Sequence, residues 1–451
     1  MTTIVQTADE AIAFLYSRID YERISASLSA SDFKLERMRT LLAHLGDPHE
    51  VTPVVHIAGT KGKGSTGAMI SAALTASGYR TGLFTSPHLE RFEERIRIDA
   101  EPIPERAFVE LVNVLIEATR AIDALPGGMG PTFFELTTAL AWLWFAKSSA
   151  DIAVLEVGLG GRLDSTNLCC PELTVITTIS RDHTHILGSR LSEIAAEKAG
   201  IIKAGIPVVS GVKADEARRV IREFAEKHSA PFSEIDRDFS YEVVPTSNGD
   251  LSRIHSTGGD FEFPSGNRGN HQTHNAAIAT EALCQLRRRD WSIDDKVIRH
   301  VIENVRCPAR IEILEGSPTV IIDAAHNWAS VAALLQTIES LGIPGRRVLI
   351  FAASRDKDIR GLLRRLLSQF DTVILTQFQS NPRTVTVDEL RPIVAELTAR
   401  GVHDRPSAES ALQLARQLCP SDGLICIAGS FYLAVEMRRL VAQSIDARAD
   451  A

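Results

Sequence analysis

The chain has 451 residues, a formal net charge of −8 and 44% hydrophobic residues. It exceeds one typical domain of about 100 to 200 residues, so we expect two or more domains. The negative charge argues against nucleic acid or an acidic membrane as the main partner, because phosphate groups are bound by clustered Lys and Arg. The longest nearly apolar run, residues 136–146, is shorter than the roughly 20 residues that cross a bilayer, and it indicates a buried helix.

The N-terminal residues and the cysteines favour a cytoplasmic location. Residues 1–15 have neither the basic start nor the long apolar stretch of a secretory signal. The six cysteines form no C-x-x-C motif and include one adjacent pair, Cys169-Cys170, unlike a disulfide framework or a zinc site. We therefore expect reduced and mostly buried thiols.

The first half of the chain alternates between strand-like and helix-like segments. Residues 51–59 indicate a strand, and residues 65–79 indicate a helix that ends near Gly78. Further strands rich in Val, Ile, Leu or Thr are expected at residues 80–86, 151–158 and 172–180. Helical patterns separate most of them, which predicts an α/β domain with a mostly parallel sheet.

The pattern changes after about Val208 and becomes mixed as far as Phe263. Residues 243–269 predict short antiparallel strands joined by Gly, Asn and Ser turns, which we interpret as an appendage of the first domain. A helix is expected at residues 274–288. A second α/β series follows, with strands predicted at residues 319–327, 346–354 and 371–378. We expect two domains, residues 1–304 and a smaller Rossmann-like α/β domain at residues 305–451.

Residues 56–69, HIAGTKGKGSTGAM, lie between the first predicted strand and helix. The standard P-loop pattern has Ser or Thr directly after Gly-Lys, whereas Gly64 follows Lys63 here and the hydroxyls come later, at Ser65 and Thr66. Backbone N–H groups at a helix N-terminus favour an anion, and glycines permit a close approach. The strand before and the helix after favour a P-loop-type phosphate site over a simple glycine turn.

Glu156 interrupts a strand that is otherwise apolar. A buried carboxylate needs a partner, and Mg²⁺ is one candidate because it prefers oxygen ligands and bridges carboxylates to nucleotide phosphates. An arginine or a backbone amide is the alternative. Ser86-Pro87 at a strand end and Lys198 near a helix end have ordinary structural explanations, a turn and a favourable helix dipole.

Several separated motifs resemble the Mur ligase superfamily and, more narrowly, the folylpolyglutamate synthase and dihydrofolate synthase family. They include the Gly-Lys-Gly-Ser loop, the segment VLEVGLGGRLDSTN at residues 154–167, and Asp182-His183-Thr184. The resemblance extends from residues 33–38 to residues 428–433, with the motifs in the same order. Lys61 stands where Asn is common in bacterial members.

The resemblance implies an ATP-binding fold and assigns roles to individual residues. The ATP-binding residues would be Gly59, Lys61, Gly62, Lys63, Gly64, Ser65, Thr66, Asn275, Arg310 and Asp323. The Mg²⁺ ligands would be Ser86, Glu156, His183 and a carbamylated Lys198. The substrate-contacting residues would be Phe133, Phe134, Glu135, Arg162, Leu163 and Asp164 for the pterin group, and Ser430 for glutamate. The residues that take part in catalysis would be Lys63, Lys198 and His326.

Alternative explanations remain for several of these residues. Neighbouring aromatic residues on a helix are usually core residues, so Phe133 and Phe134 owe their substrate role to the resemblance alone. Asp323, His326 and Ser430 would otherwise be ordinary polar residues at strand ends. Before Arg310, Ala309 replaces the usual glycine, and residues 29–38 match a substrate loop too loosely to assign individual roles.

The activity implied is ATP-driven amide formation. A carboxylate of folate or dihydropteroate would attack the γ-phosphate of ATP, and the amine of L-glutamate would then displace phosphate from the acyl phosphate. Partners would be small molecules, without nucleic acid or membrane, and the protein would be a monomer. The alternatives are a Mur-type ligase for another carboxylate, such as a cell-wall precursor, and a nucleotide-binding regulator without catalysis.

Overall fold

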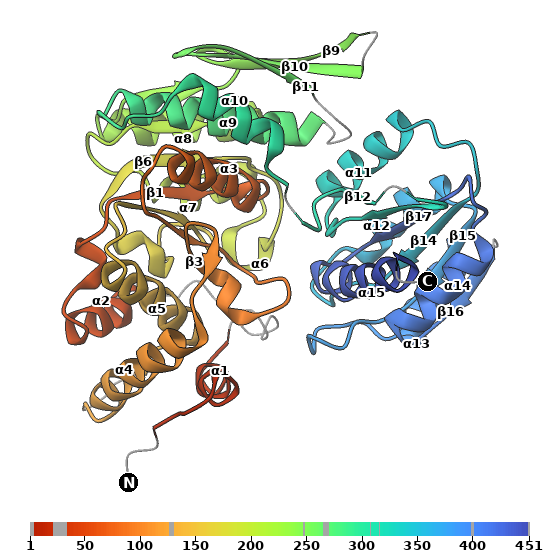
Figure 1. The fold of residues 1–451 in the computed structure, drawn as a ribbon, viewed down its shortest axis with the longest axis horizontal. Helices are drawn as coiled ribbons and strands as arrows, with labels where there is room; N and C mark the ends of the chain where they lie inside the picture. Colours follow the sequence, from red (N-terminus) through yellow and green to blue (C-terminus); the bar gives the residue numbers. More distant parts are fainter. Residues whose placement is uncertain are drawn as a thin grey trace. The chain divides into compact units, whose positions relative to one another are not determined.

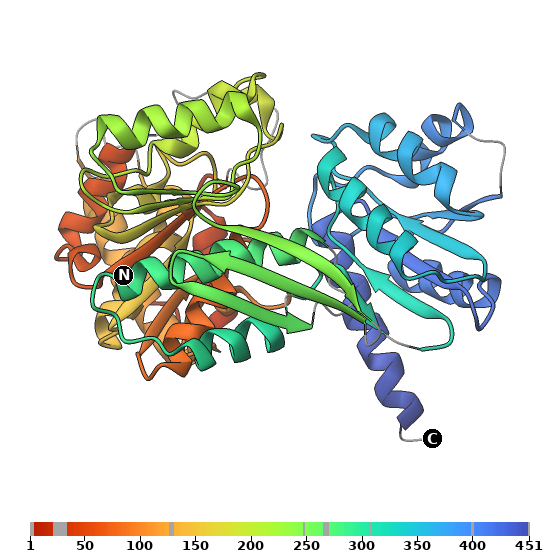
Figure 2. The ribbon, with the colours of Figure 1, turned by 90° about the horizontal axis from the view of Figure 1, so that it is seen from above.

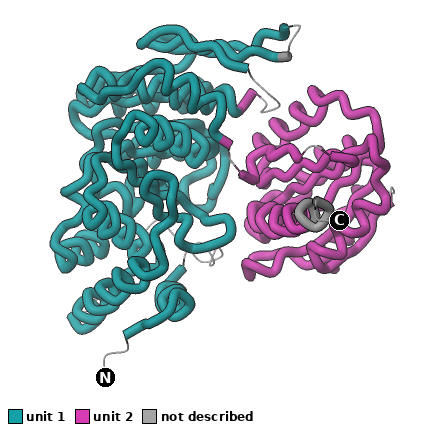
Figure 3. Tube along the Cα trace, viewed as in Figure 1, with its two compact units in different colours: residues 1–22, 27–265, 272–305 teal, residues 23–26, 266–271, 306–451 magenta. Residues whose placement is uncertain are grey.

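The computed structural model describes most of the chain and separates it into two compact units (Figures 1 and 3). The described residues are 4–20, 34–125, 130–246, 249–264, 270–306, 308–314, 316–397 and 401–449. Unit 1 comprises residues 1–22, 27–265 and 272–305, and unit 2 comprises residues 23–26, 266–271 and 306–451. Part of the loosely matched segment 29–38, residues 29–33, lies outside the described residues.

Unit 1 is built on an eight-stranded sheet with the strand order β4-β3-β2-β5-β1-β6-β7-β8. The strands are β1 (Val54–Ala58), β2 (Thr81–Phe84), β3 (Ile96–Ile98), β4 (Glu101–Pro102), β5 (Ile152–Glu156), β6 (Pro171–Ile176), β7 (Val208–Ser210) and β8 (Phe232–Glu234). All neighbours from β2 to β8 are parallel, and β3 and β4 are antiparallel. The prediction of a mostly parallel sheet is therefore confirmed.

Helices cover both faces of this sheet because its strands are buried on both sides. Val54 of β1 joins one hydrophobic cluster with α1 (Ala8–Tyr16), α2 (Leu35–His44), α4 (Glu105–Asp123) and α5 (Phe133–Lys147). Val55 and Ile57 point to the opposite face, against α3 (Lys63–Ala76), α9 (Asn270–Arg287) and α10 (Asp295–Asn304). A third cluster contains α7 (Leu191–Ala199) and α8 (Asp215–Lys227), and the short α6 is Thr184–Leu187.

The apolar run at residues 136–146 lies in the buried helix α5, as predicted. Within the described ranges, no helix is long and apolar enough to span a membrane. The cysteines that the structure describes are all free thiols, and all of them except Cys170 are buried.

The antiparallel appendage is a three-stranded sheet of β9 (Ser240–Thr246), β10 (Gly249–Ser256) and β11 (Gly259–Pro264), visible along one side of unit 1 in Figure 2. It begins later than expected, because residues 208–234 form β7, α8 and β8 and continue the main sheet. Ile254 and Phe261 pack into the cluster around α9. The fully buried Glu281 of α9 accepts hydrogen bonds from the Thr257 N–H (2.9 Å) and the Ser233 hydroxyl (2.8 Å).

Unit 2 contains a six-stranded sheet with the order β12-β13-β17-β14-β15-β16. The strands are β12 (Glu312–Leu314), β13 (Thr319–Ile322), β14 (Arg347–Phe351), β15 (Thr372–Leu375), β16 (Val402–Asp404) and β17 (Leu424–Ala428). All are parallel except β12. One face packs against α11 (Trp328–Ser340), α12 (Ile359–Leu366) and α13 (Val387–Ala395), while α14 (Ala408–Leu418) and α15 (Phe431–Ala449) also contact the sheet.

Candidate active site

The candidate residues of unit 1 gather at the carboxyl edge of its sheet. The adjacent strands β2, β5, β1 and β6 are parallel, so the segments that follow them meet at one edge. Open α/β sheets place their ligands at this edge. Ser86, Glu156 and the glycine-rich loop all lie there.

The glycine-rich loop leads directly into α3. Gly62 is the residue before the first turn of α3 and has a left-handed φ of 85°. A Cβ atom at Gly62 would lie 2.2 Å from Asn275 Oδ1, and one at Gly59 would lie 1.9 Å from Thr177 Oγ1. The loop therefore requires glycine at both positions. Because Gly62 cannot cap the helix with a side chain, the first N–H groups of α3 have no side-chain cap, which is the arrangement that an anion site needs.

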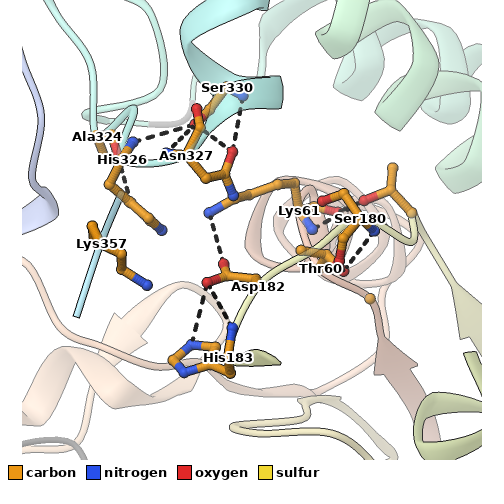
Figure 4. A network of polar contacts seen from close by, with 12 residues as sticks. Thr60, Lys61, Ser180, Asp182, His183, Ala324, His326, Asn327, Ser330 and Lys357 are labelled. Atoms are coloured by element: carbon orange, nitrogen blue, oxygen red, sulfur yellow. Dashed lines mark hydrogen bonds and ion pairs between the residues drawn. The ribbon is translucent and has the colours of Figure 1, made fainter. Parts of the chain in front are cut away.

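Two threonines after β6 hold the loop in place. The Thr178 hydroxyl accepts the Lys61 N–H (3.0 Å), and the Thr177 hydroxyl donates to the Lys61 carbonyl (2.7 Å). Thr60 is also hydrogen-bonded to the backbone of Ser180, as Figure 4 shows. Our sequence analysis missed these threonines, since only the strand order places them beside the loop.

The structure brings Lys63, Glu156 and Ser86 close together, as we expected from the sequence. Lys63 Nζ lies 3.7 Å from Glu156 Oε1 and donates to the Gly59 carbonyl (3.1 Å). The Ser86 N–H donates to Glu156 Oε2 at 3.4 Å, and Glu156 is only 8% exposed. Gly64 lies against the same carboxylate, since a Cβ there would be 3.4 Å from Oε2. A cation and a backbone amide thus both contact the buried carboxylate.

The hydroxyl residues at the start of α3 are buried beside this group. Ser65 is 5% exposed and Thr66 is fully buried. Within the described part of the chain, Thr66 Oγ1 has no hydrogen-bond partner. A buried hydroxyl without a partner is costly, so this oxygen suits a polar ligand.

Lys61, Asp182 and His183 form a polar group at the same edge (Figure 4). Lys61 Nζ lies 3.5 Å from Asp182 Oδ2, and His183 Nε2 lies 3.8 Å from Asp182 Oδ1. His183 has a left-handed φ of 49° and a half-exposed side chain. Among the described residues, no three His, Cys, Asp or Glu side chains lie close enough together to hold a metal ion.

Lys198 is buried near the end of α7, with only 5% exposure. Burial is the main cause that lowers its pKa to about 7, and the nearby positive charge of Lys63 adds to the effect. A substantial share of this amine is therefore uncharged near neutral pH.

The predicted pterin-contacting residues at the start of α5 have unequal surroundings. Phe133 is fully buried, stacks on Tyr16 at 4.8 Å and contacts the Arg95 guanidinium at 5.2 Å. The expectation that Phe133 is available to stack on a substrate does not agree with this packing. Phe134 is half-buried and covers Gly158, where a Cβ would lie 2.3 Å from its ring.

Glu135 is held by two structural interactions. Its carboxylate lies 3.1 Å from Arg37 Nε, and both side chains are less than one-tenth exposed. It also accepts the Thr132 N–H at 2.8 Å and so caps its own helix. Arg37 is a partner that the sequence analysis did not identify.

The loop after β5 is anchored by Asp164. Its carboxylate accepts the Thr166 hydroxyl (2.6 Å) and the Leu159 N–H (2.9 Å). Burial raises the pKa of Asp164, although these hydrogen bonds oppose the shift. Arg162 is exposed and pairs with Glu197 at 2.9 Å, and Leu163 is half-buried.

The candidates of unit 2 lie at the carboxyl edge of the second sheet. Asp323 is buried and accepts the Ile311 N–H at 2.7 Å. Arg310 lies 5.7 Å from the Phe431 ring centroid, and the residues on either side of it, Ala309 (φ 56°) and Ile311 (φ 48°), are left-handed. The replacement of the usual glycine by Ala309 therefore falls at a position that favours glycine.

His326 and Ser430 follow two neighbouring strands of this sheet. His326 Nδ1 lies 2.7 Å from the Ala324 carbonyl, so this nitrogen is the donor (Figure 4). Asn327 caps α11 by accepting the Ser330 N–H. Ser430 is 2% exposed, and its hydroxyl accepts the Tyr432 N–H at 3.2 Å.

Comparisons with known proteins agree with this architecture. The family model described as Mur ligase middle domain matches residues 113–283, and the one described as Mur ligase, glutamate ligase domain matches residues 309–431. The dihydrofolate synthase/folylpolyglutamate synthase of Bacillus subtilis is 35% identical over 420 residues, which cover 90% of this chain and 94% of the relative. The chain belongs to the folylpolyglutamate synthase and dihydrofolate synthase family.

Two solved structures of this family are similar over nearly the whole chain. Escherichia coli FolC in complex with DHPP and ADP has a TM-score of 0.84 at 28% identity and covers 100% of both chains. Mycobacterium tuberculosis folylpolyglutamate synthase complexed with ADP and AMPPCP also has a TM-score of 0.84, at 31% identity, covering 96% of this chain and 97% of that one. Membership of this family makes the chain an ATP-dependent ligase, as the sequence analysis predicted.

Proposed function

We propose that this protein joins L-glutamate to folate, and to dihydropteroate, with ATP as the energy source. The observation that carries the proposal is the grouping of Lys63, Glu156 and Ser86 beside the N-terminus of α3. This edge has what phosphoryl transfer needs: backbone donors for phosphate, a mobile cation and a buried carboxylate. FolC in complex with DHPP and ADP supports a pterin-linked substrate.

In the first step, a substrate carboxylate oxygen forms a bond to the γ-phosphorus of ATP and ADP leaves. Lys63 would turn from Glu156 toward the phosphates, where its charge stabilises the charge that develops during transfer. The N–H groups of α3 and the Thr66 hydroxyl would orient the nucleotide. Asn275, in contact with Gly62, would hold the loop from the α9 side.

In the second step, the amine of L-glutamate attacks the acyl carbon and phosphate leaves. The amine must lose a proton, and His326 is our candidate for the acceptor. Its Nδ1–H is directed at the Ala324 carbonyl, so in the neutral ring the basic nitrogen is Nε2. The glutamate ligase domain matched at residues 309–431 supports placing the amino-acid step on unit 2.

The residues of unit 1 are suitable for Mg²⁺. Glu156 supplies a buried carboxylate, Ser86 lies against it, and His183 follows at the same edge. Because the described residues contain no dense metal-binding cluster, a magnesium ion would take its remaining ligands from phosphate and water. When bound, it would neutralise part of the phosphate charge. A neutral Lys198 amine could bond to the carbon of carbon dioxide and lose a proton to solvent, and the resulting carbamate would be anionic.

The test is glutamate-dependent product formation by the purified full-length protein. We expect product masses to increase by one glutamyl residue with dihydropteroate and with reduced folates, and ADP release to require both acceptor and L-glutamate. Turnover only with a nucleotide-linked sugar carboxylate would instead indicate a Mur-type ligase for another substrate. ATP binding without any acceptor-dependent turnover would indicate a regulator. We further propose a cytoplasmic monomer, which size-exclusion chromatography and cell fractionation would test.

A further inference from the structure

A buried histidine lies in the middle of β1, between apolar residues of the same strand. His56 is fully buried, and its neighbours Val55 and Ile57 belong to the hydrophobic core. Burial lowers the pKa of His56 to about 3, with a smaller contribution from the positive charge of Lys203, so the ring is neutral near pH 7. The nitrogens of a buried imidazole need hydrogen-bond partners, and these partners show which segments the ring joins.

Both ring nitrogens of His56 have a side-chain partner from the segment just before β6. Nε2 lies 2.8 Å from the hydroxyl of Thr166, which belongs to the short helix η4 (Ser165–Leu168). Nδ1 lies 3.4 Å from the thiol sulfur of Cys169. Thr166 is fully buried and Cys169 is nearly so. A histidine at the centre of the sheet is thus bonded on both sides to the segment that follows the loop after β5.

Asp164 fixes the direction of every hydrogen bond in this group. Its Oδ1 accepts the Thr166 N–H (3.0 Å) and its Oδ2 accepts the Leu159 N–H (2.9 Å), so both oxygens act as acceptors. The Thr166 hydroxyl lies 2.6 Å from Oδ1 and donates its only proton to Asp164. It must then accept from His56 Nε2, which leaves Nδ1 to accept the Cys169 S–H. We call this ordered set of four side chains the buried hydrogen-bond chain.

The carboxylate at the end of the buried hydrogen-bond chain holds the loop after β5, residues 157–164. The N–H groups of Gly158 and Leu159 both bond to Asp164. These two amides follow closely after Glu156, the carboxylate of the candidate phosphate site. The position of Asp164 therefore determines the position of the backbone directly after Glu156.

The loop contacts two further parts of the candidate active site. A Cβ at Gly158 would lie 2.3 Å from the ring of Phe134, which is half-buried and is one of the residues predicted to contact the pterin group. The Arg162 N–H donates to the Glu197 carbonyl at 2.8 Å, next to Lys198 near the end of α7. A displacement of the loop would therefore move groups on two sides of the candidate active site.

We propose that His56 and Thr166 are positioning residues for the acceptor substrate, and that they act through Asp164 on the loop at residues 157–164. The inference rests on the proposed function and adds to it two buried residues outside the predicted substrate contacts. Asp164 is fixed from the centre of the sheet, and it fixes the loop beside Phe134 in turn. Loss of the buried hydrogen-bond chain should weaken binding of the acceptor. The glycine-rich loop keeps its own anchors after β6, so ATP binding should be retained.

The test compares Thr166→Val with Thr174→Val in the full-length protein. Thr174 of β6 is also fully buried and lies beside His56 in the sheet, and among the described residues its hydroxyl has no hydrogen-bond partner. The chemical change is the same at both positions, but only Thr166→Val breaks the chain. Thr166→Val should raise the KM for dihydropteroate and for a reduced folate about tenfold or more, with the KM for ATP within about twofold of the wild type. Thr174→Val should leave both KM values unchanged.

Conservative variants separate positioning from a general loss of packing. Thr166→Ser keeps the hydroxyl and should restore the KM for the acceptor to near that of the wild type. His56→Gln keeps an N–H that can donate to Thr166, so it should raise this KM less than His56→Leu, which has no donor. An unchanged acceptor KM in Thr166→Val, an equal rise in the KM for ATP, or an equal effect of Thr174→Val would overturn the proposal, as would a Thr166→Ser variant no better than Thr166→Val.

Hydrogen–deuterium exchange follows the loop directly and requires no turnover. The Leu159 N–H is bonded to Asp164, so its exchange rate reports on the chain. Exchange in residues 157–164 should become about tenfold faster in Thr166→Val and stay unchanged in Thr174→Val. Faster exchange in a protein that transfers glutamate to neither acceptor would support the chain and overturn the proposed function. Unchanged exchange in Thr166→Val would refute the inference even if the protein is an active ligase.

Discussion

Gly62 offers a sharp test of how the glycine-rich loop is held. Its φ of 85° is left-handed, and a Cβ atom would lie 2.2 Å from Asn275 Oδ1. A left-handed alanine costs about 1–2 kcal/mol. To avoid the clash Asn275 must move, which breaks its hydrogen bond to Gln272 (3.1 Å) and costs about 1 kcal/mol more. Gly62→Ala should therefore lower the free energy of unfolding of unit 1 by about 2–3 kcal/mol.

Gly78, just beyond the other end of α3, supplies the matched control. Its φ is 93°, and a Cβ there would have nothing within 4 Å. Gly78→Ala should cost only the backbone term, about 1–2 kcal/mol. Urea unfolding measures both losses. Because Gly62 begins the anion-binding turn, Gly62→Ala should also raise the KM for ATP about tenfold or more, an effect of roughly 1.4 kcal/mol, while Gly78→Ala should not change it.

Equal behaviour of the two variants would refute this reasoning. If Gly62→Ala and Gly78→Ala lost the same stability and kept the same KM for ATP, contact with Asn275 would not determine the conformation of the loop. A second check is Gly62→Ala combined with Asn275→Ala. Removing the clashing side chain should make the glycine substitution less costly than it is in the wild type.

Three other predictions follow from buried ionisable groups. Glu156→Gln removes the carboxylate that faces Lys63 and should lower kcat/KM for ATP by about 100-fold or more. The rate of ADP release, followed over a magnesium titration, measures this loss. A half-saturating magnesium concentration equal to that of the wild type would contradict a metal-binding role for Glu156. Glu135→Ala leaves Arg37 buried without this carboxylate and should lower the free energy of unfolding, measured in urea, by about 3–5 kcal/mol. Adding Arg37→Met should recover most of this loss. If the double variant recovers no stability, loss of the ion pair is not the cause. Burial lowers the pKa of His56 to about 3. Between pH 6.5 and 3, His56 therefore binds a proton in the unfolded chain but not in the folded protein, and the free energy of unfolding decreases as the pH is lowered. From pH 6.5 to 5, the wild type should lose about 1.6 kcal/mol more than His56→Gln, and equal slopes would contradict the assigned pKa.

The sequence predicted the local features of the site because they depend on neighbouring residues. The strand, loop and helix around Lys63 follow from composition and glycine spacing, and Glu156 was recognisable as a carboxylate inside an apolar strand. The family resemblance added the order of the motifs. Short strands such as β7 and β8 were missed because three residues are too few to show a period of two.

Contacts between distant segments could not be predicted in this way. Thr177 reaches the loop only because β6 lies next to β1, and Arg37 meets Glu135 across two helices. Phe133 and Phe134 show a further limit. Adjacent residues on a helix point about 100° apart, so the two rings could not both face one pocket, and the sequence did not indicate which would be buried.

The small antiparallel sheet bears on how members of this family can diverge. Its inner residues, including Ile254 and Phe261, complete the core around α9, and Glu281 is buried beneath it with hydrogen bonds from Thr257. Deleting the sheet would remove these donors from Glu281 and uncover the core around α9. We therefore expect sequence variation within the family to be concentrated on the outward face of the sheet, where Arg253 pairs with exposed acidic residues of the neighbouring strands. Natural insertions should fall at its turns.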